Sequence, residues 1–79
     1  MTYEEFKQQI GAILDIESSE LTEGTHRDSL ATWDSMAALN IISLLDDVCE
    51  DEISSDDIET FISFGAIIEF ARNKGIIKG

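Results

Sequence analysis

The segment between Gly24 and Gly65 contains neither glycine nor proline, and the whole chain of 79 residues has no proline at all. Since these two residue types interrupt helices, their absence permits a long helix in this part of the chain. The apolar side chains of residues 36–49 fall on most faces of such a helix, and only a narrow polar stripe interrupts them. We therefore expect a helix over residues 34–50 that other elements cover on most sides, as the central part of the fold.

Capping residues indicate where the other helices begin. Thr2 has a glutamate three residues later, as in a capping box, which predicts a helix that fades near Asp15. Serines precede a short helical turn over residues 54–58, and Ser63 precedes a last helix over residues 64–73. The fold class that follows is all-α: a small antiparallel four-helix bundle with three main helices, one short helix and a long first loop.

The loop over residues 16–34 is long for a compact domain and is too apolar for a free linker. Leu21, Leu30 and Trp33 are expected to hold it against the bundle. With no sign of an internal boundary, residues 1–79 are expected to form a single domain. The apolar residues that we place in its core are Leu39, Ile41, Leu45, Ile53, Ile58, Ile67 and Ile68.

The chain has 17 acidic and 5 basic residues, for a formal net charge of -12. This balance argues against binding to nucleic acid or to an anionic membrane surface, and favours a partner that carries a basic patch. No apolar stretch approaches the roughly 20 residues of a membrane span, so membrane insertion is not expected. The N-terminus has no basic region followed by an apolar run, so we expect a cytoplasmic protein.

Acidic residues crowd the end of the central helix and the segment after it, at positions where they oppose the helix dipole. Such a run is usually a solvated face. An EF-hand would need a glycine inside the loop, and none occurs here, so no specific metal site is expected, although loose binding of divalent cations remains open. The residues of this run are Asp46, Asp47, Glu50, Asp51, Glu52, Asp56 and Asp57.

The residues that usually perform catalysis are sparse. A single cysteine, Cys49, excludes an internal disulfide and a cysteine-rich zinc site, and it is expected to be a small buried apolar residue. The single histidine, His26, is expected to be exposed in the first loop. A serine hydrolase would also need an oxyanion hole and a nucleophile elbow, for which the sequence gives no sign. We therefore do not expect an enzyme.

The segment that carries chemical information is the start of the central helix. Asp34 is a good N-cap, and Ser35 then occupies the first helical position. Unpaired backbone N–H groups and the helix dipole favour negative charge there, so a phosphate ester on Ser35 would be tolerated. Met36 is equally suited to core packing and to contact with a partner. The alternative is that Asp34 and Ser35 form a helix cap and nothing more.

Several features together resemble the acyl carrier and peptidyl carrier protein family over nearly the whole chain. They are the Asp34-Ser35-Met36 motif, its continuation over residues 41–47 into an acidic helix end, Glu52-Ile53 before a short acidic helix, and the capped last helix. In that family the serine of the motif carries 4'-phosphopantetheine, which a phosphopantetheinyl transferase attaches from coenzyme A. The resemblance implies that Ser35 is the attachment site and that the thiol of the arm holds cargo as a thioester.

The resemblance also implies a carrier that acts as a monomer with separate enzymes. Their basic patches would dock on Met36, Asp46, Asp47, Glu50 and Ile53 of this chain. The spaces between its core residues are where an acyl chain could be sheltered.

The subtype remains open. Thr32 stands where many members of the family have glycine, and Trp33 next to the motif is a feature of carriers outside housekeeping fatty-acid synthesis. An acyl carrier in a fatty-acid, polyketide or dedicated lipid or secondary-metabolite pathway is the first hypothesis, and an aminoacyl or peptidyl carrier is the second. An acidic helical interaction module without a cofactor is the alternative from a different class.

Overall fold

The computed structural model describes residues 1–50 and 52–77. Most of these residues are helical, as predicted, and they contain no β-strand. The long connection between the first two α-helices contains two short 3-10 helices, η1 (Ser18–Glu20) and η2 (Arg27–Ser29). The four α-helices are α1 (Tyr3–Leu14), α2 (Ser35–Val48), α3 (Ser55–Glu59) and α4 (Phe64–Asn73).

The predicted helix starts are confirmed by side-chain hydrogen bonds. The Thr2 hydroxyl accepts from the Glu5 N–H at 3.2 Å, and the Glu5 carboxylate accepts from the Thr2 N–H at 3.1 Å, which completes a capping box. These bonds lower the pKa of the Glu5 carboxyl below its usual value. Ser54 and Asp57 form the same box before α3, and the Ser63 hydroxyl caps α4. Each start is therefore fixed locally, by residues close together in the chain.

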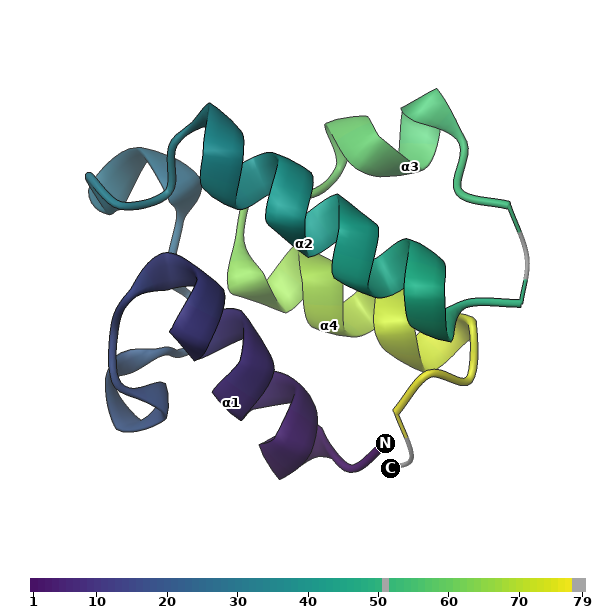
Figure 1. Ribbon diagram of the computed structural model, residues 1–79, viewed down its shortest axis with the longest axis horizontal. Coiled ribbons are helices and arrows are strands. Elements are labelled where there is room, and N and C mark those ends of the chain that lie inside the picture. The colour runs from purple at the N-terminus through teal and green to yellow at the C-terminus, as the bar shows by residue number, and fades with distance from the viewer. Residues whose placement is uncertain (51, 78–79) are drawn as a thin grey trace.

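Three helices surround one hydrophobic core. Figure 1 shows that α1 runs in the direction opposite to α2, whereas α4 runs in the same direction as α2 and the short α3 lies apart from α1. Full burial of a large apolar side chain contributes about 1.5–3 kcal/mol relative to leaving it in water. The buried hydrophobic residues of these three helices are Phe6, Ile10, Leu14, Ala37, Ile41, Leu45, Phe64, Ile67, Ile68, Phe70 and Ala71.

The long first loop is packed against this core, as the sequence predicted. The Leu21 side chain is fully buried, the Trp33 side chain is buried, and Leu30 packs against the core from a half-buried position. The three apolar side chains therefore hold the loop in place between α1 and α2.

Two backbone hydrogen bonds also connect this loop to the junction of α3 and α4. The Arg27 N–H donates to the Ile62 carbonyl, and the Phe64 N–H donates to the Thr25 carbonyl, each at 2.9 Å. This is the pattern of an antiparallel bridge, and it joins segments far apart in the sequence. The loop therefore has a defined position relative to α4.

A glycine permits a third contact of this kind. The Gly65 N–H donates to the Glu23 carbonyl at 3.0 Å, and a Cβ atom at residue 65 would lie only 2.6 Å from that carbonyl oxygen. In a helix, alanine is normally favoured over glycine by about 1 kcal/mol, but here the backbone oxygen occupies the space. We expect Gly65→Ala to lower the free energy of unfolding by about 1–3 kcal/mol in urea denaturation.

Gly24→Ala is the matched control, because the nearest atom to a Cβ there is the Thr22 hydroxyl oxygen at 3.8 Å. That variant should be close to the unsubstituted protein in stability. A Gly65→Ala variant as stable as the control would contradict the close approach of the loop to α4.

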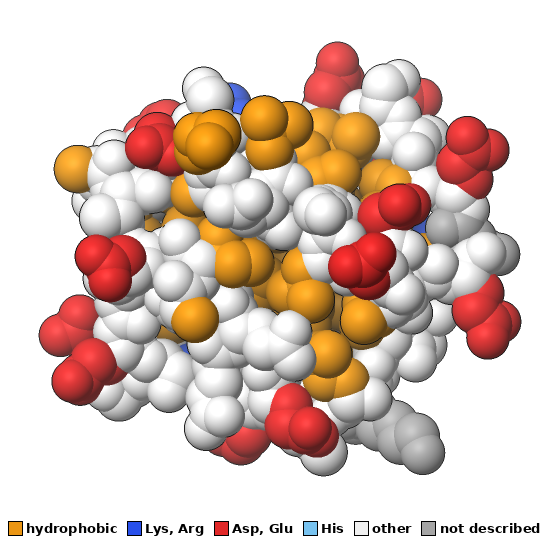
Figure 2. All heavy atoms as spheres, in the orientation of Figure 1, with side chains coloured by type: hydrophobic (Ala, Val, Ile, Leu, Met, Phe, Trp, Pro, Cys, Tyr) orange, Lys and Arg blue, Asp and Glu red, His pale blue; other side chains and the backbone are white. Residues whose placement is uncertain are grey.

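The prediction that other elements cover α2 on most sides is wrong. Only Ala37, Ile41 and Leu45 of this helix are buried, whereas the Met36 side chain is 68% exposed and the Leu39 side chain, which was placed in the core, is 61% exposed. Figure 2 shows hydrophobic atoms at the surface along α2, with acidic side chains around them. A domain this small has too few other elements to enclose a long helix, so one face of α2 meets water.

Candidate functional site

Ser35 is the first residue of α2, and its side chain is exposed. The preceding residue, Asp34, has extended backbone geometry and caps the helix, because its Oδ1 accepts from the Ala37 N–H at 3.0 Å. The structure therefore places Asp34 and Ser35 where the sequence predicted them. The hydroxyl is accessible and lies at the helix end where backbone N–H groups favour negative charge.

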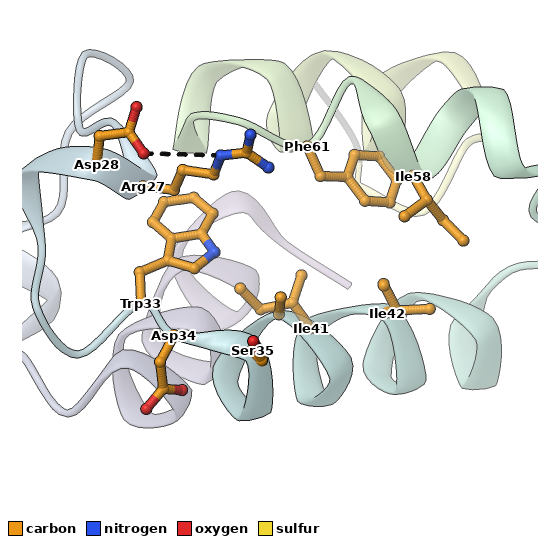
Figure 3. Close-up of a pocket in the computed structure, with 10 residues that line it drawn as sticks. Arg27, Asp28, Trp33, Asp34, Ser35, Ile41, Ile42, Ile58 and Phe61 are labelled. Atoms are coloured by element: carbon orange, nitrogen blue, oxygen red, sulfur yellow. Dashed lines mark ion pairs between the residues drawn. The ribbon is translucent and has the colours of Figure 1, made fainter.

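A pocket of about 400 Å³ lies beside this serine. Ile41 and Ile42 of α2 line one side, and Ile58 and Phe61 line the opposite side (Figure 3). This volume is within the roughly 300–1,000 Å³ range of small-molecule sites, and the mainly apolar lining is also typical of them. An exposed hydroxyl at a helix start is therefore combined with an apolar pocket next to it.

The pocket also has charged groups at one edge. Arg27 and Asp28 of η2 lie there, with 4.0 Å between the Arg27 Nε and the Asp28 Oδ1. Both side chains are largely exposed, so this ion pair contributes little to stability. Figure 3 shows the Asp34 carboxylate directed away from the pocket. Arg27 was not predicted from the sequence to be a site residue. The signal that could have identified it is that it is a basic residue in the loop before the Asp34-Ser35 pair.

The residues proposed for partner contact do not all form one exposed surface. Met36, Asp46, Asp47 and Glu50 are exposed on α2 or just after it, but Ile53 is half-buried against the core. The helix itself ends at Val48, before the predicted Glu50. Asp51, which belongs to the acidic run in the sequence, lies outside the described residues.

His26 and Cys49 are the single histidine and the single cysteine of the chain. His26 lies in the first loop, as expected, with 42% of its side chain exposed, and its Nδ1 accepts from the Asp28 N–H at 3.1 Å. Cys49 is half-buried beside the core. Within residues 1–50 and 52–77, no group of three or more His, Cys, Asp or Glu side chains is arranged to hold a metal ion. None of the helices in this part of the chain has the length and apolar character that a membrane crossing requires.

No protein-family model, no curated protein and no solved structure matches this chain. Its function is therefore inferred from the geometry of the site: an exposed serine at a helix start, an apolar pocket beside it and an uncovered helix face.

The cap of α2 gives a direct test of how the serine is positioned. Asp34→Ala removes the oxygen that accepts from the Ala37 N–H, so we expect the free energy of unfolding to fall by about 1 kcal/mol. Asp34→Asn keeps an accepting oxygen, so its free energy of unfolding should fall much less. Chemical denaturation of both variants measures the difference, and equal stability of the two would contradict the capping role.

Proposed function

We propose that this chain is an acyl carrier protein with the small four-helix bundle of that family, and that Ser35 carries 4'-phosphopantetheine. The observation that supports this most is the position of the Ser35 hydroxyl, exposed at the first turn of α2 and directly beside the pocket. The arm would supply a thiol that holds acyl groups as thioesters.

The residues around Ser35 fit a phosphodiester. Attachment forms a bond between the Ser35 Oγ and the pyrophosphate phosphorus of coenzyme A that bears the pantetheine. The bond from this phosphorus to the bridging oxygen breaks, adenosine 3',5'-bisphosphate leaves with that oxygen, and the serine proton passes to a base on the transferase. The ester then lies at the positive end of α2, where negative charge is stabilised by about 0.3–1 kcal/mol. The Asp34 side chain is turned aside, which limits repulsion between its carboxylate and the phosphate.

The pocket favours an acyl group over an aminoacyl group as cargo. Ile41, Ile42, Ile58 and Phe61 offer apolar surface close to the attachment point. Burial of hydrocarbon stabilises by about 25 cal/mol for each Å² removed from water, a contribution that a polar aminoacyl group would obtain only in part. An aminoacyl or peptidyl carrier remains the second hypothesis within the family.

The uncovered face of α2 suits the docking of separate enzymes. Met36 and Leu39 are large exposed apolar side chains, and Asp46 and Asp47 are exposed on the same helix. An apolar centre with acidic surroundings complements an enzyme surface that has an apolar patch and basic residues nearby. The same face would serve an acidic interaction module without a cofactor, so it does not discriminate between the two classes, whereas Ser35 does.

The experiment is an intact-mass measurement after incubation with coenzyme A and a broad-specificity phosphopantetheinyl transferase. The protein should gain the mass of one phosphopantetheine, and Ser35→Ala should gain none. Ser43→Ala is the matched control, because Ser43 is also an exposed serine of α2 and its loss should leave the gain intact. No gain by the folded protein would overturn the proposal and leave the cofactor-free module as the better hypothesis.

A further inference from the structure

The wall of the pocket beside Ser35 consists of two unlike parts. Most of it is apolar, but Arg27 and Trp33 add hydrogen-bond donors at one end. A pocket that only sheltered hydrocarbon would have no use for donors, because polar groups that are removed from water without a partner cost free energy. These donors therefore carry information about the cargo.

The Trp33 side chain is only 8% exposed, and its ring packs with the core. Figure 3 shows the indole nitrogen on the side of the ring that faces the pocket. Within the described part of the chain, this N–H donates no hydrogen bond. Among the described residues, no buried side-chain nitrogen or oxygen lacks a hydrogen-bond partner, so this N–H is open to water inside the pocket. It is therefore a donor that a ligand in the pocket can use in place of water.

The Arg27 guanidinium lies across the pocket from the Ser35 side chain, beside Trp33 and Phe61 (Figure 3). Its ion pair with Asp28 uses the Nε atom and is long, at 4.0 Å. A guanidinium has five N–H donors in a planar fork, so most of its donors face the pocket or solvent without a tight partner. Its place across from Ser35 means that it faces the contents of the pocket rather than a phosphate at the attachment point.

We propose that this pocket selects an acyl chain that carries a carboxylate in addition to its thioester. The inference rests on the proposed function. The aliphatic part of the chain packs between Ile41, Ile42 and Ile58, and the carboxylate binds the Arg27 guanidinium and the Trp33 N–H. Arginine forms two parallel hydrogen bonds with a carboxylate, whereas a neutral hydroxyl or keto oxygen would use only part of the fork.

The charge of the chain makes a carboxylate in this pocket depend on Arg27. With a net charge of -12, the protein repels anions in general, so an anionic cargo needs a local cation to remain in the pocket. Arg27 is the basic residue that lines this pocket. The weak pair with Asp28 leaves the guanidinium available to a second carboxylate.

The test compares two cargoes with the same number of carbon atoms. The transferase loads Ser35 from hexanoyl coenzyme A or from adipoyl coenzyme A, and intact mass verifies that each load is complete. The chain contains one tryptophan, so a proton–nitrogen spectrum shows a single indole N–H signal. We expect the adipoyl form to shift this signal downfield and slow its exchange with water, whereas the hexanoyl form should do neither. The melting temperature of the adipoyl form should exceed that of the hexanoyl form by roughly 5 °C.

Variants separate the proposed contact from a general effect of charge. Arg27→Gln should remove the difference between the two loaded forms, and Asp28→Asn should enlarge it. Arg72→Gln is the matched control, because Arg72 belongs to α4, lies over the Tyr3 ring and does not line the pocket. It should leave the difference unchanged.

The possible outcomes are distinguishable. A protein that gains no mass overturns the proposed function and this inference together. A protein that is loaded but gives the same indole signal with both cargoes overturns the inference alone and indicates a pocket for plain hydrocarbon. A difference that persists in Arg27→Gln overturns the role assigned to the guanidinium.

Discussion

Phe64→Ala is expected to remove about 3–5 kcal/mol from the free energy of unfolding, as is usual when a large buried aromatic residue is truncated. Phe64 begins α4 and has no exposed surface, and its ring lies 6.5 Å from that of Phe6 and 6.4 Å from that of Tyr3. For a chain of this length, total stability is on the order of 4–12 kcal/mol. The substitution therefore consumes a large fraction of that stability and should leave a substantial unfolded population at 37 °C.

Urea denaturation followed by far-ultraviolet circular dichroism measures this effect. Met36→Ala is the control, because it also shortens a large apolar side chain, but one that is mostly in water. Its stability should change by less than about 0.5 kcal/mol. Similar losses for the two variants would mean that the core is not centred on the contact between α1 and α4.

The melting temperature is expected to rise by roughly 5–15 °C when sodium chloride is raised from 10 to 150 mM, which corresponds to about 1–2 kcal/mol for a domain of this size. The described residues measure 30 × 25 × 19 Å. The Debye length falls from about 30 Å to about 8 Å over this range of salt. At low salt each acidic group repels all the others across the molecule, whereas at the higher salt it senses only its neighbours. A melting temperature that does not change with salt would contradict self-repulsion as a limiting factor.

Two double variants with the same change in net charge test where this repulsion acts. Asp46→Asn with Asp47→Asn removes charge from the last turn of α2, which has no basic residue and where acids oppose the helix dipole. Glu4→Gln with Glu5→Gln removes charge from the first turn of α1, where acids are favourable. The first pair should raise the melting temperature at low salt more than the second pair does. Equal increases in melting temperature would indicate that the net charge alone, and not the position of the charges, sets the repulsion.

The helix starts could be predicted from the sequence because the interactions that fix them are local. Thr2, Ser54 and Ser63 each accept a backbone N–H from three residues ahead, so the pattern of residues and the hydrogen bond coincide. The position of Ser35 after its Asp34 cap could be predicted for the same reason. Anchoring of the first loop could also be predicted, since three large apolar side chains, including Trp33, are too many for a free linker.

The features that the sequence did not predict depend on contacts between distant segments. Leu39 lies on a helix that is apolar on most faces, and periodicity alone cannot tell which face is left without a neighbour. The pocket requires Arg27 from the first loop and Phe61 from the segment after α3 to lie near the same face of α2. Phe70 is buried against the Phe61 ring, at a centroid distance of 5.0 Å, which is again a tertiary contact.

The bridge between the first loop and the start of α4 has a consequence for how this molecule fluctuates. The amides of Arg27 and Phe64 can exchange with solvent only when the two segments separate, so the loop and the first turn of α4 belong to one cooperative unit. The side of the pocket with Arg27 and the side with Phe61 are tied together at this end by backbone rather than by side chains. A long connection that contains only two short 3-10 helices therefore gives the pocket a wall held by backbone hydrogen bonds, and we expect local opening there to involve the first turn of α4 as well.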